Sequence, residues 1–119
     1  MINMIFDAQL LIVQESPYSI YSPWFVRLAD NARFTLEVVA INGSPEIKLE
    51  VIDRVDDGSG IPTALGGNIA LSATGRTTAE WTGLKALVRF RFTITPNAGG
   101  TEWILFRVPS PIWFSDVKV

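Results

Sequence analysis

Residues Leu84 to Thr95 (LKALVRFRFTIT) constrain the fold more than any other stretch, because apolar and polar side chains alternate along it. Side chains of a β-strand point in turn to opposite faces, so one set is buried and the other meets water or a partner. The apolar set is Leu84, Ala86, Val88, Phe90, Phe92 and Ile94, and the opposite set is Lys85, Arg89, Arg91, Thr93 and Thr95. We therefore expect a central strand with a buried inner face and a cationic outer face.

Further segments of the chain show the same two-residue period and are separated by turns rich in Gly, Pro and Asn. They are residues 6–14, 33–42, 46–53, 68–73, 76–81, 101–108 and 112–119. The Asn42-Gly43 pair suits a hairpin, which predicts that 33–42 and 46–53 are antiparallel neighbours. In residues 16–25, Pro17 and Pro23 prevent a long strand ladder and predict a bent edge segment or a loop that carries an aromatic cluster. For 6–14 both faces are apolar, so we expect it to be covered on both sides.

No stretch has a helical period over a helical length, and about eight short strands separated by Gly/Pro turns are typical of sandwiches. The chain has 119 residues, the usual size of one domain. The sequence thus predicts an all-β, single-domain antiparallel β-sandwich over 1–119, jelly-roll-like, in which residues 1–20 add an N-terminal strand or arm.

Composition excludes several function classes. There are no cysteines and no histidines, so disulfides, thiolate chemistry, Cys/His zinc sites and serine–histidine catalysis are ruled out. The net charge is −2 with no basic run, which gives no footprint for nucleic acid. No apolar run reaches membrane-spanning length, and the N-terminal residues lack the basic start of a signal peptide. We expect neither an enzyme nor a nucleic-acid or membrane partner.

Clustered carboxylates occur in one loop, where Asp53, Asp56 and Asp57 precede a Gly-Ser-Gly run. Calcium prefers several oxygen ligands, and acidic loops supply them. The spacing does not match an EF-hand, and Asp and Gly also favour turns by themselves. The same acids do not form a recognisable glycosidase pair, because no aromatic-lined cleft with two separated carboxylates is apparent. These aspartates are the candidate metal ligands, but turn formation is the simpler interpretation. We expect no cofactor.

The cationic face of the central strand has natural partners. Glu37, Glu46 and Glu50 lie on the outer faces of other predicted strands, and Lys48 lies among them. If these strands share a sheet with Arg89 and Arg91, opposite charges meet across it. The alternative is a polar contact face for a neighbouring subunit, where arginine is enriched.

Aromatic residues suggest where a partner binds. Trp24, Trp81, Trp103 and Trp113, with Tyr18 and Tyr21, are candidates either for a sugar-stacking platform or for core packing. Trp103 and Leu105 lie opposite Ile104 and Phe106, so they form an exposed apolar pair if the Ile104 side is buried. Such a patch indicates a protein interface more often than a sugar platform. The candidate interface residues, all apolar and out of phase with the core, are Trp24, Phe25, Trp103, Leu105, Trp113, Met1, Ile2, Met4 and Ile5.

Three phrases carry a resemblance to a known group: YSPWFVRLADNARFTLEVVAI (21–41), TGLKALVRFRFTI (82–94) and TEWILFRVPSPIWF (101–114). They resemble small β-sandwich head decoration, or minor capsid (cement), proteins of tailed bacteriophages. The resemblance implies a structural protein, made in the host cytoplasm and located on the capsid surface of the virion. Its implied partners are the major capsid protein and copies of itself, in a homo-oligomer within the assembly. The alternative function is a carbohydrate-binding β-sandwich module on a virion or cell surface.

Overall fold

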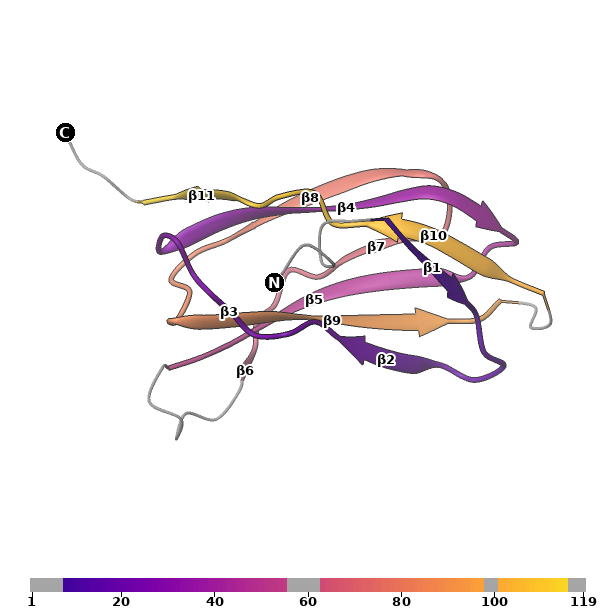
Figure 1. The fold of residues 1–119 in the computed structure, drawn as a ribbon, viewed down its shortest axis with the longest axis horizontal. Coiled ribbons are helices and arrows are strands. Elements are labelled where there is room, and N and C mark those ends of the chain that lie inside the picture. Colours follow the sequence, from indigo (N-terminus) through magenta and orange to yellow (C-terminus); the bar gives the residue numbers. More distant parts are fainter. Residues whose placement is uncertain (1–7, 56–62, 98–100, 116–119) are drawn as a thin grey trace.

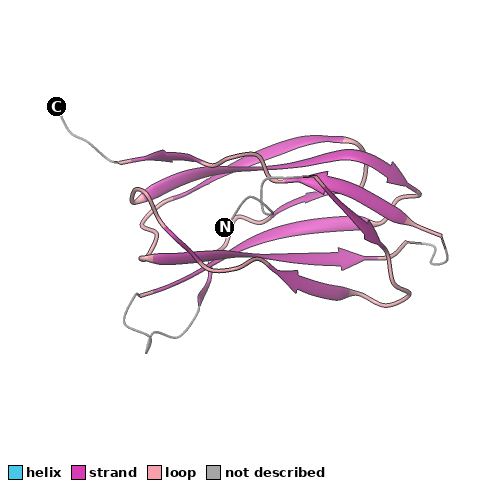
Figure 2. Ribbon diagram, in the orientation of Figure 1, coloured by secondary structure: helices cyan, strands magenta, loops and turns pink. Residues whose placement is uncertain are grey.

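A computed structural model of the chain describes residues 8–55, 63–97 and 101–115. The described residues form strands and loops without any helix, as the alternation predicts (Figure 2). The strands are β1 (Gln9–Ile12), β2 (Tyr18–Tyr21), β3 (Phe25–Val26), β4 (Asn31–Asn42), β5 (Glu46–Arg54), β6 (Thr63–Ala64), β7 (Ile69–Leu71), β8 (Gly75–Trp81), β9 (Leu87–Thr95), β10 (Trp103–Arg107) and β11 (Ile112–Phe114).

The strands form two antiparallel sheets that pack face to face (Figure 1). In sheet A, β1 pairs with β10 and β10 with β4, while β8 and β11 also pair with β4. In sheet B, β2 and β3 pair with β9, β9 pairs with β5, and β6 and β7 pair with β5. Without the short strands β3, β6 and β11, the orders are β1-β10-β4-β8 and β2-β9-β5-β7. The chain changes sheet at nearly every turn, which is jelly-roll order and confirms the predicted fold class.

The Asn42-Gly43 turn does not form the predicted hairpin. β4 belongs to sheet A and β5 to sheet B, so the turn carries the chain across the sandwich. Gly43 has a φ of 83°, and a Cβ there would lie 2.8 Å from a carboxylate oxygen of Glu102. The prediction was wrong because alternation shows which face of a strand is buried but not which strand lies beside it. β7 and β8, which follow each other in the chain, also lie in different sheets.

Aromatic rings fill the centre between the sheets. The ring of Phe34 lies 5.0 Å from that of Phe90, 5.4 Å from that of Trp81 and 5.9 Å from that of Trp113, centre to centre. Inward positions of β4, β5 and β9 complete this core with aliphatic side chains. The fully buried ones include Leu36, Ile47, Leu49, Val51, Val88 and Ile94.

The central strand β9 begins three residues later than the alternation predicts. Leu84 is buried, but its N–H donates to the carbonyl of Asp30 at 2.8 Å. The N–H of Lys85 donates to the carboxylate of Asp53 at 2.9 Å. Gly83 precedes them with a φ of 65°. These loop contacts take up the backbone donors, so 84–86 keep their apolar phase without joining the sheet.

The predicted bent edge segment is present as β2 and β3, which both run along β9. Ser22 bridges the break between them: its N–H donates to the Phe90 carbonyl at 3.0 Å, and its Oγ accepts the Phe90 N–H at 2.9 Å. The predicted aromatic cluster is divided, because Phe25 points into the core while Tyr21 is half exposed on the outer face. Within the described ranges, no helix is long and apolar enough to cross a membrane.

Candidate interaction surfaces

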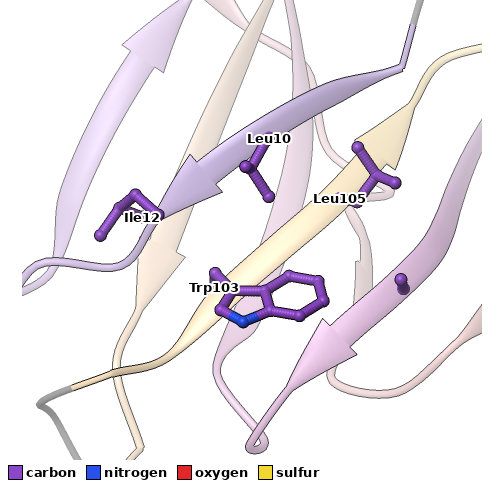
Figure 3. Close-up of a pocket in the computed structure, with 5 residues that line it drawn as sticks. Leu10, Ile12, Trp103 and Leu105 are labelled. Atoms are coloured by element: carbon purple, nitrogen blue, oxygen red, sulfur yellow. The ribbon is translucent and has the colours of Figure 1, made fainter.

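The outer surface of sheet A carries an exposed hollow lined by apolar side chains of three neighbouring strands (Figure 3). We call it the apolar face; its residues are Leu10, Ile12, Ala40, Trp103 and Leu105. Cross-strand pairing brings them together: Leu10 opposes Leu105, Ile12 opposes Trp103, and Leu105 opposes Ala40. Leu10 is 60% and Ile12 is 66% exposed. The expectation that both sides of this first strand are covered is wrong, because only Leu11 and Val13 pack inward.

Two features extend the apolar face. A β-bulge in the pairing of β10 with β4 leaves Val39 exposed beside Ala40. On its outer side β1 has no partner strand in the described ranges, and the Ile12 carbonyl there accepts the Tyr18 hydroxyl at 3.2 Å. The hollow and this edge of the sheet lie next to each other, since Leu10 and Ile12 belong to that strand.

Other parts of this surface carry ion pairs between neighbouring strands. The Glu37 carboxylate lies 2.5 Å from Arg107 Nε and 3.4 Å from Arg76 Nη2. The hydrogen bond from Arg107, followed by the charges of both arginines, lowers the pKa of Glu37. Farther along, Arg33 pairs with Glu80 at 2.6 Å. Apolar groups beside paired charges are consistent with the apolar centre and polar rim of a protein interface.

The interface residues predicted from strand alternation lie in different parts of the structure. Trp103 and Leu105 lie together on the apolar face, whereas Trp24 lies on sheet B. Phe25 is buried in the core, and Trp113 packs edge-on against it with ring centres 6.3 Å apart. The expectation that Phe25 and Trp113 are out of phase with the core is therefore wrong. The remaining candidates, Met1, Ile2, Met4 and Ile5, lie outside the described residues.

Sequence reasoning missed Leu10 and Ile12. The signal was present, because both alternate with Leu11 and Val13, but apolar residues on both faces hid which side is exposed. Pairing with Trp103 and Leu105 decides it, and that pairing is a long-range feature of the fold.

On the outer surface of sheet B, the predicted ion pairs form in part. Arg91 donates to both carboxylate oxygens of Glu50, at 3.0 and 2.7 Å. Glu37 cannot serve this sheet, because it belongs to sheet A and pairs there with Arg107. Arg89 has no ion pair among the described residues. Its guanidinium carbon instead lies 4.5 Å from the ring centres of both Tyr21 and Trp24.

A second arginine joins this arrangement. The guanidinium carbon of Arg54 lies 4.6 Å from the centre of the Trp24 ring. We call Tyr21, Trp24, Arg54 and Arg89 the Arg–aromatic cluster. Ile52 opposes Arg89 on the same outer surface yet is 5% exposed, so the surrounding side chains keep water from it.

The Glu50–Arg91 pair makes stability depend on pH. The hydrogen bonds from Arg91 lower the pKa of Glu50 from its ordinary 4.5, so the folded protein binds this proton less tightly than the unfolded chain. The contribution is complete above about pH 5 and is lost as pH falls through the lowered folded pKa. We expect the free energy of unfolding of Glu50→Gln, measured with urea, to fall less than that of the wild type between about pH 5 and pH 3. Equal losses in the two proteins would contradict this assignment.

The candidate metal ligands do not form a described site. Asp53 is buried, and one of its oxygens accepts the Lys85 N–H at 2.9 Å, which is a structural role. Asp56 and Asp57 lie outside the described residues. In the ranges that the structure describes, no three His, Cys, Asp or Glu side chains come together to hold a metal ion.

The four tryptophans do not form a row on one surface. Trp81 is in the core, where its indole N–H donates to the Gly66 carbonyl at 2.7 Å. Trp113 also packs against the core, Trp24 is stacked by arginines on sheet B, and Trp103 lies in an apolar hollow on sheet A. A sugar-stacking platform combines exposed rings with polar hydrogen-bonding groups, and this arrangement does not supply one continuous surface of that kind.

No protein-family model, no curated protein and no solved structure matches this chain.

Proposed function

We propose that this protein is a structural component that attaches to a protein assembly through the apolar face of sheet A. The observation that carries the proposal is the uncovered hollow between β1, β10 and β4, with Leu10 and Ile12 more than half exposed. Exposed apolar patches of this kind are typical of protein contact sites.

The assembly that we propose is the head of a tailed bacteriophage, with the major capsid protein as the occupant of the apolar face. Two sequence features support this choice. The YSPWF, TGLK and EWILFR phrases resemble head decoration proteins, and charged residues make up only 18% of the chain. A jelly roll is also a common fold of capsid proteins, although it serves lectins and enzymes as well.

The proposal is tested with shells of the capsid protein. We expect a major capsid gene beside the gene for this chain, and we expect the wild-type chain to sediment with shells of that capsid protein. Leu105→Asp places a charge in the middle of the apolar face and should weaken binding at least about tenfold. Ile112→Asp is the matched control, because Ile112 is 57% exposed on the same sheet, on β11. Binding of this control should stay close to the wild-type value.

Thermal unfolding of both variants checks that they remain folded, and Trp103→Ala replaces Leu105→Asp if that variant does not fold. Shells that carry wild-type chain and Leu105→Asp in equal amounts would exclude the apolar face as the contact. If the wild-type chain stays in the supernatant, the capsid role itself is wrong.

A further inference from the structure

We infer that the Arg–aromatic cluster on sheet B binds a carboxylate-rich segment of a partner protein. This site goes beyond the proposed function, because it lies on the opposite side of the sandwich from the apolar face (Figure 1). It is also independent of any capsid, since every contact that defines it comes from this chain.

Two arginines stack on one tryptophan ring. The guanidinium carbons of Arg54 and Arg89 lie 4.6 and 4.5 Å from the centre of the same Trp24 ring. Neither arginine forms an ion pair with a described residue. The nearest acid across the strands, Glu50, uses both carboxylate oxygens on Arg91. The negative face of an aromatic ring attracts cations, so Trp24 and Tyr21 hold the two guanidinium groups in place.

The stacking also orients the donors. The Nε atoms of both arginines are buried and have no hydrogen-bond partner in the described part of the chain. Both residues are nevertheless partly exposed, so the cluster is open to a partner. A planar guanidinium fixed by a ring presents its edge in one direction, which suits the two oxygens of a carboxylate.

The composition of the cluster indicates a protein partner. Trp, Tyr and Arg are the residues most enriched where protein interfaces derive their affinity. A nucleic acid carries a closely spaced run of phosphates. Along the same side of β5 the cluster is followed by Glu50, Lys48 and Glu46, so no continuous basic track leads away from it. A short acidic segment needs no such track, since it places its charge on Arg54 and Arg89 alone.

The test uses the full chain and a capped tetraglutamate peptide as the probe. Binding is followed by calorimetry and by the NMR signals of the arginine Nε–H groups at low salt. We expect the peptide to shift the Arg54 and Arg89 signals and to bind more weakly as salt increases. Arg54→Gln/Arg89→Gln should weaken binding at least tenfold. Arg33→Gln is the matched control and should change binding less than twofold, because Arg33 pairs with Glu80 on sheet A.

A second variant separates charge from geometry. Arg89→Lys keeps the charge but removes the planar fork, so binding between that of the wild type and the double variant is expected. Arg89→Lys also replaces the double variant in the binding test if the double variant does not fold. Capped tetraglutamine, inorganic phosphate and a short single-stranded oligonucleotide are the comparison probes. Tighter binding of phosphate or the oligonucleotide than of tetraglutamate would overturn the proposed ligand class. Equal binding of tetraglutamate to wild type and double variant would show that the stack is only structural.

Discussion

Replacing Phe34 with alanine should remove a large part of the stability of this domain. Phe34 is fully buried, and its ring contacts Trp81, Phe90 and Trp113, which come from three other strands. Removing a buried phenylalanine side chain costs about 3–5 kcal/mol, and a domain of this size is stable by about 5–15 kcal/mol. Urea unfolding followed by circular dichroism should therefore show a much lower midpoint with an unchanged slope.

Phe34→Leu is the graded control, because it keeps part of the apolar volume and should lose clearly less stability than the alanine variant. Thr74→Ala, at an exposed position between β7 and β8, should stay within about 0.5 kcal/mol of the wild type. A loss of less than about 1 kcal/mol in Phe34→Ala would mean that the aromatic core is not the centre of stability.

The faces of the long strands could be predicted from the sequence. Alternation identifies Phe34 and Leu36 in β4, and Val88 and Phe90 in β9, as buried, and all four are. Strand order could not be predicted in the same way. A two-residue period is the same whether β4 and β5 pair or pack across the sandwich, and here they pack across it.

Part of the apolar face could be predicted from the sequence, but the Arg–aromatic cluster could not. Trp103 and Leu105 were identified because their own strand shows that they point away from Ile104 and Phe106. The Arg–aromatic cluster was not identified, because it needs three strands in a known order. β9 supplies Arg89, β5 supplies Arg54, and the chain on the β2 side supplies Tyr21 and Trp24. With the order unknown, glutamates appeared to be the natural partners of Arg89.

Trp103 and Trp113 were both predicted to be interface residues from strand alternation, but they have different surroundings in the structure. Trp113 packs against the core, with ring centres 6.3 Å from Phe25 and 5.9 Å from Phe34, so Trp113→Ala opens a cavity beside both rings. We expect it to cost about 2–4 kcal/mol, somewhat less than a fully buried tryptophan. Trp103 lies in the open hollow of the apolar face, so Trp103→Ala should change stability by less than about 1 kcal/mol.

Urea unfolding of the two alanine variants under the same conditions makes the comparison direct. The matched chemistry matters, because both changes delete the same indole and differ only in what surrounds it. Equal losses would mean that the apolar face is part of the folded core and not a surface kept for a partner. A large loss confined to Trp113→Ala would leave Trp103 free for binding, since a side chain that contributes little to folding can be used to bind a partner without weakening the fold.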